Sequence, residues 1–253
     1  MKIRLKTEAD ITMMRVSGTI LADTIKTLAS EAKEGVTLAA LDKRARTLIA
    51  DAGGSPTFLG YTPEGAPKPY PAALCASVNE KIVHGIPNGY VLKNGDILSI
   101  DLGVTYKGYI TDAAITIGIG KISDEAKELI KVTERSLEEA IKECEVGKHL
   151  GDIGFAVENT AKKAHFSVIQ GLTGHGVGFE LHEDPSVFNY GRRGDGMKLV
   201  PGLVLAIEPM LSIGSPYAIA LRDGSFETRD KSLSAHFEHT IAITEKGYEV
   251  LTR

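Results

Sequence analysis

The amino-acid sequence predicts an α+β fold in which an antiparallel sheet is covered by two pairs of helices. Three observations support this prediction. Apolar residues recur at helical spacing in four segments, which fall into two pairs. A stretch rich in β-forming residues follows each pair. The order of elements is therefore ααβ and then ααβ, with no linker between the halves, which predicts one domain over residues 1–253.

The first helix pair is expected between Thr7 and Gly54. From Thr7 to about Glu34, apolar or small residues are spaced three or four apart, at Ile11, Met14, Gly18, Leu21, Ile25 and Leu28. A second helix is expected to start at the N-cap Thr37 and to stop at Gly53-Gly54. Its inner face would carry Leu38, Leu41, Ala45 and Leu48.

Residues 55–72 contain five prolines and three aromatic residues, which predicts a long loop. Long loops in compact domains often serve a functional site. Short β-rich runs follow over 91–119, helical patterns occupy 124–146 and 150–165, and β-like segments return from 168 to the end.

Two matched segments indicate that the halves are related. The run from Leu92 to Asp101 matches the run from Leu199 to Glu208 at an offset of 107 residues, and each run ends on a carboxylate. Gly35, Leu38 and Leu41 also reappear as Gly147, Leu150 and Ile153. A repeat of about half the chain predicts a pseudo-two-fold domain, with Asp101 and Glu208 at equivalent positions beside a shared interface.

The composition of the chain excludes several classes of function. The chain has 33 acidic and 29 basic residues and a net charge of -4. Its sequence has no concentration of basic residues that would bind nucleic acid or an anionic membrane. Two cysteines without CxxC spacing, Cys75 and Cys144, are typical of a reducing compartment. We see neither a signal sequence nor an apolar run long enough to span a membrane, and we expect a cytoplasmic protein.

The first candidate site residues are two aspartates. Asp101 ends the apolar run ILSID, Asp112 follows eleven residues later, and Lys107-Gly108 lies between them as a turn. In a hairpin centred there, the carboxylates would lie nearly opposite one another, and two ionised groups at that distance need a cation or a proton between them. The alternative is that Asp101 starts a turn and Asp112 caps an element.

The second half strengthens the metal hypothesis. Glu208 closes the run LVLAIE, Glu238 stands at the head of another apolar strand, and His175 lies in the glycine-rich run TGHGVG. Four carboxylates and one imidazole form a mostly hard ligand set that suits manganese or iron(II) better than a thiolate-preferring zinc site. Four negative charges balance two divalent cations, and one bridging hydroxide would then be available as a nucleophile.

For two of the remaining histidines, the sequence alone does not decide between a structural and a functional role. His84 and His182 can each be structural, and the odd spacing of His182 from His175 puts them on opposite faces of a strand unless the glycines make a bend. The other four histidines have no comparable setting and are interpreted as structural: His149, His165, His236 and His239.

These motifs together resemble the type I methionine aminopeptidases, within the larger family of pseudo-symmetric "pita-bread" metallopeptidases. The resemblance covers nearly the whole chain. It rests on the runs CASVNEKIVHGIP from Cys75 to Pro87, Asp101-Leu-Gly, Asp112, Gly174-His175-Gly-Val-Gly, His182-Glu-Asp-Pro, Ile207-Glu208-Pro-Met and Phe237-Glu238-His-Thr.

The resemblance implies a catalytic metallopeptidase that removes the N-terminal methionine when the second residue is small. It implies two divalent ions, with manganese, iron(II), cobalt and zinc all left open. Asp101 and Asp112 would bind one ion, His175 and Glu208 the other, and Asp112 and Glu238 would bridge them. Glu208 would relay the proton to the leaving amine, and His84 and His182 would contact the substrate.

The resemblance also implies an apolar methionine pocket, which would be lined by Phe58, Tyr61, Tyr70, Cys75 and Phe226. The stretch between Tyr61 and Tyr70 is longer than is usual in the family, Phe58 stands where the family often has a small residue or cysteine, and Leu181 replaces a common phenylalanine. The chain has no tryptophan, and Phe226, after Asp223-Gly224, is expected to supply the aromatic ring usual there.

The partners implied are the N-termini of nascent polypeptides, including those at the ribosome, acted on by a monomer without nucleic acid or membrane. Two alternatives remain. An Xaa-Pro aminopeptidase or proline dipeptidase would share the run GVGFELHEDP, but such enzymes usually carry an additional N-terminal domain. A metal-free binding protein on this scaffold is expected to have lost ligands, whereas all five are present.

Overall fold

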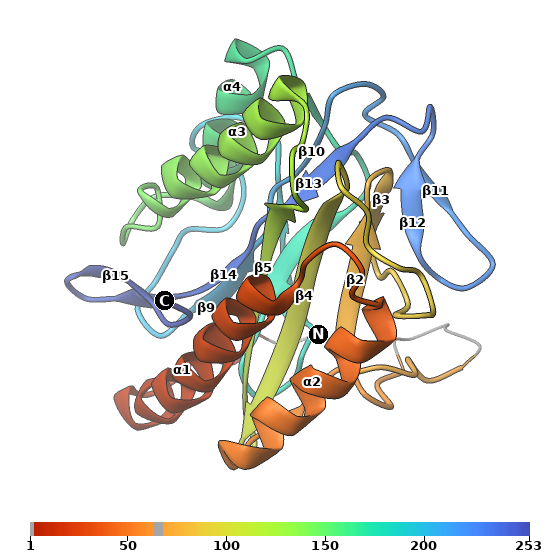
Figure 1. Cartoon of the computed structure of the whole chain (residues 1–253). Helices are drawn as coiled ribbons and strands as arrows, with labels where there is room; N and C mark the ends of the chain where they lie inside the picture. Colours follow the sequence, from red (N-terminus) through yellow and green to blue (C-terminus); the bar gives the residue numbers. More distant parts are fainter. Residues whose placement is uncertain (1–2, 63–67) are drawn as a thin grey trace.

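The computed structural model of the chain describes residues 3–62 and 68–253. Within these residues four helices form two pairs, one at each side of the molecule, as Figure 1 shows. Their bounds are α1 Glu8–Glu31, α2 Leu38–Asp51, α3 Asp124–Ile141 and α4 Leu150–Lys163. The predicted α+β class with two helix pairs is confirmed, although α1 and α3 end three to five residues before the expected positions.

The strands are short apart from two. Their bounds are β1 Ser55–Pro56, β2 Leu74–Val78, β3 Lys81–Val83, β4 Ile97–Tyr106, β5 Tyr109–Gly118, β6 Ser167–Val168, β7 Thr173–Gly176, β8 Glu183–Phe188, β9 Val204–Ile207, β10 Met210–Ser212, β11 Ala218–Ala220, β12 Phe226–Thr228, β13 Ser234–His236, β14 His239–Thr244 and β15 Gly247–Val250. They pair antiparallel into sheets ordered β1-β4-β2 with β5 on β4, β13-β10-β6, β11-β12-β3 and β15-β14-β9-β7-β8.

The helices begin where the sequence provides caps. The Thr7 side chain accepts a hydrogen bond from the Asp10 N–H, and the Asp10 carboxylate accepts one from the Thr7 N–H, which satisfies donors at the start of α1. Thr37 caps α2 as predicted. Ile49, rather than the expected Leu48, is fully buried at the end of the α2 inner face.

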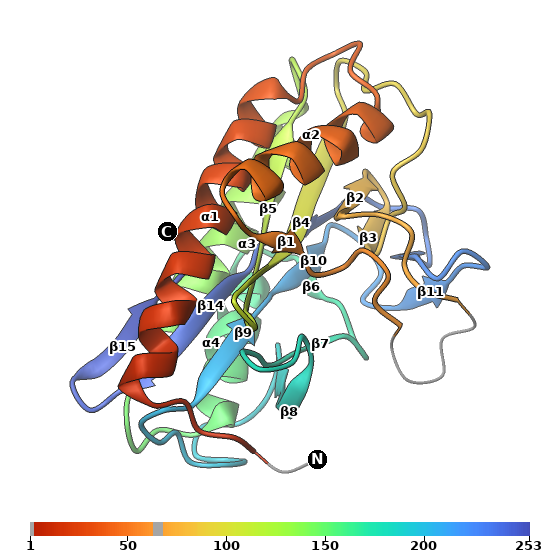
Figure 2. The ribbon, with the colours of Figure 1, turned by 90° about the horizontal axis from the view of Figure 1, so that it is seen from below.

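Each helix pair covers its own apolar core. The pair α1–α2 packs on β2 and β4 around residues such as Leu41, Leu98 and Ile100. The pair α3–α4 packs on β9, β10 and β14 around residues such as Leu129 and Leu205. Figure 2 shows α1 and α2 together along one side of the strands, with β7 and β8 away from them. The described residues contain no helix that is long and apolar enough to cross a membrane.

The hairpin β4–β5 places the two candidate aspartates. Lys107 and Gly108 both have positive φ, as a two-residue hairpin turn requires. With this turn, Asp101 pairs with Ala114 and Asp112 pairs with Gly103. The aspartates are therefore diagonal neighbours on one face rather than directly opposite, and Asp101 lies in the middle of β4 rather than at its end.

Strand β5 is also the place where the two sequence halves join. The Glu238 N–H donates to the Ala114 carbonyl over 2.8 Å, just before β14 begins. The Thr240 hydroxyl donates to the Asp112 carbonyl over 2.8 Å and accepts from the Asp112 N–H over 2.9 Å. The backbones that carry Asp112 and Glu238 are thus fixed to one another across the junction.

Candidate metal centre

A cavity of about 570 Å³ opens beside this junction. Its lining includes all the predicted metal ligands and most of the predicted pocket residues: Phe58, Tyr61, Tyr70, Cys75, His84, Asp101, Asp112, His175, His182, Glu208 and Glu238. Phe226 does not line it. The Phe226 ring instead packs edge-on against the His84 ring, with centroids 5.7 Å apart.

Three of the predicted ligands come together closely. One ligand atom each from Asp112, His175 and Glu238 lies within 4.8 Å of the other two. Glu208 joins this group, because its Oε1 lies 3.5 Å from the His175 Nε2. Asp101 lines the same cavity from the adjacent strand β4. Residues more than a hundred positions apart in the chain therefore share one site.

Three of the four carboxylates, Asp101, Asp112 and Glu238, are buried, and the Glu208 side chain is 12% exposed. Over residues 3–62 and 68–253, none of them pairs with a lysine or arginine, and Asp112 Oδ1 and Glu238 Oε1 lack any hydrogen-bond partner. Burial raises the pKa of Asp101 and of Glu208 to about 7. Burial, and then the neighbouring carboxylates, raise the pKa of Asp112 and Glu238 well above the usual range. Such an arrangement of acceptors fits a bound metal cation.

His175 is oriented as a metal ligand would be. Its Nδ1 lies 2.9 Å from the Gly176 carbonyl oxygen. Because a carbonyl oxygen only accepts, Nδ1 carries the hydrogen, and the lone pair is left on Nε2, the atom that faces Glu208. A neutral imidazole held in this tautomer can bind a divalent cation.

His182 and His84 face the same cavity. A register shift in β7 between Gly174 and Gly176, followed by a turn into β8, provides the bend that the odd spacing requires. The His175 and His182 rings are 4.5 Å apart between centroids. Burial, reinforced by His175, lowers the pKa of His182 to about 3. Desolvation, reinforced by His236, lowers the pKa of His84. Both rings are therefore neutral at pH 7.

His236 is the residue that sequence reasoning missed, since it was interpreted as structural. Its ring is buried, and its Nε2 lies 3.4 Å from Glu208 Oε2. Neither ring nitrogen has a hydrogen-bond partner in the part of the chain that the structure describes. Burial lowers its pKa, and Asp101 acts in the opposite direction. One signal was present in the sequence: His236 and Glu238 are two residues apart in an extended segment, which places both side chains on one face.

Two further sequence observations concern the cavity wall. Leu181 is buried and lines the cavity, at the place where the resemblance led us to expect a phenylalanine. The unusual length between Tyr61 and Tyr70 involves residues 63–67, which lie outside the described residues.

The metallopeptidase family M24 model matches residues 12–245, and the chain belongs to this family. The protein is thus a metal-dependent hydrolase with the pita-bread fold. The chain is 44% identical over 251 residues to the methionine aminopeptidase of Clostridium perfringens, covering 99% of this chain and 98% of that one. It is 44% identical to methionine aminopeptidase 1 of Bacillus subtilis, covering 98% of each. The crystal structure of the Rickettsia prowazekii methionine aminopeptidase superposes with a TM-score of 0.95 at 38% identity, covering both chains completely.

Proposed function

We propose that the protein removes the N-terminal methionine from newly made proteins and peptides whose second residue is small, by hydrolysing the first peptide bond at a dinuclear metal centre. The observation that carries this proposal is the buried, uncompensated carboxylate cluster beside His175 at the floor of the cavity. The names of relatives at 44% identity over nearly the full chain support methionine as the residue released.

In this proposal Asp101 and Asp112 hold one ion, His175 and Glu208 hold the other, and Asp112 and Glu238 serve both. Two divalent cations neutralise the four carboxylates, whose burial is otherwise unfavourable. When bound, the ions supply Lewis acidity for the scissile carbonyl and for water. Oxygen and imidazole donors accept manganese, iron(II), cobalt or zinc.

The histidines act on the peptide bond itself. The Tyr61 hydroxyl lies 2.7 Å from the His182 Nδ1. When that hydroxyl donates to Nδ1, the ring hydrogen of neutral His182 is left on Nε2, free to donate to the peptide carbonyl as charge develops there. His84 lines the same cavity and would hold the scissile amide. Glu208 would pass a proton to the leaving amine.

The methionine side chain would occupy the apolar part of the cavity. Phe58 and Tyr70 meet there edge to face with ring centroids 6.4 Å apart, and Cys75 and Leu181 are buried beside them. A flexible thioether suits such an irregular wall. Phe226 would contribute by supporting the His84 ring rather than by lining the pocket.

The proposal also covers the partners, the location, the oligomeric state and the domain organisation. The enzyme would act on nascent polypeptide N-termini, including those that emerge from the ribosome, in the cytoplasm. It would act as a monomer, with residues 1–253 forming one catalytic domain of two similar halves. A net charge of -4 and two buried free cysteines are compatible with this setting.

The test is a peptide panel assayed with manganese, iron(II) and cobalt. We expect release of free methionine from Met-Ala, Met-Gly and Met-Ser peptides, and little from peptides with a long second side chain. Transfer of a methylene is worth only about 0.8 kcal/mol, so the size limit would come from steric exclusion. Faster cleavage of Xaa-Pro peptides in which Xaa is not methionine would favour the proline-specific alternative.

A further inference from the structure

A buried ion pair lies directly behind the turn that carries His182. The Lys6 Nζ donates to the Glu183 Oε2 over 2.5 Å, and the two side chains are only 2% and 5% exposed. The partners are 177 residues apart in the chain. Neither residue lines the cavity. The pair therefore lies outside the wall of the cavity.

Glu183 closes the turn formed by residues 177–182. Its second carboxylate oxygen, Oε1, accepts from the Phe179 N–H over 2.7 Å and from the Glu180 N–H over 2.9 Å. Glu183 is also the first residue of β8 and immediately follows His182. One carboxylate thus fixes both the middle of the turn and the backbone next to the His182 ring.

Lys6 connects this turn to the rest of the fold. Its N–H donates to the Gly202 carbonyl over 2.7 Å, and Thr7, the next residue, caps α1. The lysine stem passes so close to Gly178 that a Cβ there would lie 2.4 Å from the Lys6 Cε. Figure 2 shows the segment before α1 running toward β8. The turn is therefore tied to α1 and to the chain before β9.

Among the described residues, Lys6 is the only buried cation paired with Glu183. Arg4, largely exposed, pairs with Glu180 at 2.7 Å and reaches Glu183 only at 3.6 Å. Asp10, on the first turn of α1, accepts from the Tyr109 hydroxyl and from Thr7. Lys6 is thus the buried partner of the Glu183 carboxylate, while the turn is also held by the Ile110 N–H, which donates to the Gly178 carbonyl over 2.7 Å.

We propose that Lys6 is a positioning residue, which acts through Glu183 and the 177–182 turn to hold the His182 ring in place against the scissile peptide bond. The proposal rests on the proposed function, in which His182 contacts the substrate. The His182 ring has one polar side-chain partner among the described residues, Tyr61, so its position depends on the backbone of the turn.

The main test is Lys6→Met, which keeps the length of the stem and removes the charge. Misplacement of a group by about 1 Å can cost about 10²-fold, so we expect kcat to fall about 10- to 100-fold with KM and metal content nearly unchanged. The matched control is Lys148→Met, which breaks a Lys–Glu contact of 2.7 Å with Glu143 away from the cavity. We expect kcat of this control within about 2-fold of the parent.

A double-mutant cycle separates positioning from general stability. In a His182→Ala background, Lys6→Met should change kcat by less than about 2-fold, because the group that it positions is absent. An additive loss in that background, or an unchanged kcat in the single variant, overturns the proposal. If Lys6→Met does not fold, the double variant Lys6→Met/Glu183→Gln is measured instead, because it leaves no unpaired buried charge. We expect kcat of this double variant to fall by about 10- to 100-fold as well.

A readout that does not need activity distinguishes this proposal from the function proposed above. The ring resonance of His182, assigned by its loss in His182→Ala, should shift in metal-free Lys6→Met and stay in place in Lys148→Met. Absence of methionine release by the parent enzyme refutes the proposed function alone. An unshifted His182 resonance in Lys6→Met refutes the positioning role, whatever the substrate.

Discussion

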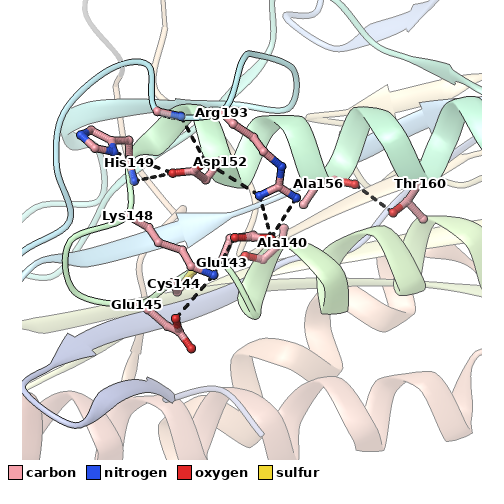
Figure 3. Close-up of polar contacts among 11 residues, drawn as sticks. Ala140, Glu143, Cys144, Glu145, Lys148, His149, Asp152, Ala156, Thr160 and Arg193 are labelled. Atoms are coloured by element: carbon pink, nitrogen blue, oxygen red, sulfur yellow. Dashed lines mark hydrogen bonds and ion pairs between the residues drawn. The ribbon is translucent and has the colours of Figure 1, made fainter.

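Two carboxylate clusters of this molecule differ in their partners. At the corner between α3 and α4, Glu143 pairs with Lys148 and Arg193, as Figure 3 shows. Asp152 accepts from the His149 and Gly194 N–H groups. At the cavity, Asp112 Oδ1 and Glu238 Oε1 have no hydrogen-bond partner within residues 3–62 and 68–253. The corner is satisfied by protein groups, whereas the acceptors at the cavity fit an external cation.

The largest expected effect comes from removing a carboxylate that would serve both ions. Glu238→Ala should lose both metals and reduce turnover by about 10³-fold or more, because Lewis acidity is worth several kcal/mol and each 1.36 kcal/mol is tenfold. Asp101→Ala should mainly weaken one metal position. Metal analysis and turnover measure both effects. Two tightly bound metals and full activity in both variants would contradict the ligand assignment.

The second prediction concerns His182, which sequence alone left open as a structural residue. We expect His182→Ala to fold, to bind metal as the parent does, and to lose about 10²-fold in turnover, the effect of removing one transition-state donor. Steady-state kinetics and a thermal melt of the same preparation check it. A loss of folding with normal turnover in the folded fraction would show that the residue is structural.

The third prediction concerns how the stability of the metal-free protein depends on pH when Asp101 is replaced by a neutral residue. In the folded metal-free protein the pKa of Asp101 is raised to about 7 from 3.8, so the folded state keeps a proton that the unfolded state releases. The free energy of unfolding contributed by Asp101 therefore falls as pH rises from about 4 to about 7.

Metal-free Asp101→Asn should gain stability relative to the metal-free parent across this window, because the amide does not ionise. His84 and His182, whose lowered pKa values act in the opposite direction, are common to both proteins and cancel. His236 does not cancel, because Asp101 raises its pKa; without Asp101 that pKa is lowered further, which adds to the same trend with pH. Urea unfolding with a chelator at pH 5 and pH 7.5 measures the difference. A difference that is constant with pH would show that Asp101 is not held protonated.

Much of the fold could be predicted because its signals are local. The Thr37 cap, the Lys107-Gly108 turn and the apolar faces of the helices all depend on residues a few positions apart. The carboxylates at the candidate metal centre could be proposed because charges inside apolar runs are unusual. The diagonal register of Asp101 and Asp112 was not predicted, although it follows from the Lys107-Gly108 turn, which pairs Asp101 with Ala114 and Asp112 with Gly103.

Contacts between distant segments could not be predicted. His236 approaches Glu208 from another strand, and Lys6 meets Glu183 across 177 residues. No periodicity connects such positions, because packing of the two halves brings them together. The pocket role of Phe226 was predicted from the resemblance alone, and the structure places its ring against His84, outside the cavity lining.

The smallest expected effect lies at the α3–α4 corner. Asp152→Ala removes the acceptor for the His149 N–H at the start of α4, 2.8 Å away, and for the Gly194 N–H, 3.1 Å away. Loss of such a cap costs about 1 kcal/mol of stability. Turnover per folded molecule should remain within about 2-fold of the parent, since Asp152 does not line the cavity. Denaturant unfolding with parallel kinetics checks it, and a tenfold loss of turnover would mean that this satisfied corner also supports catalysis.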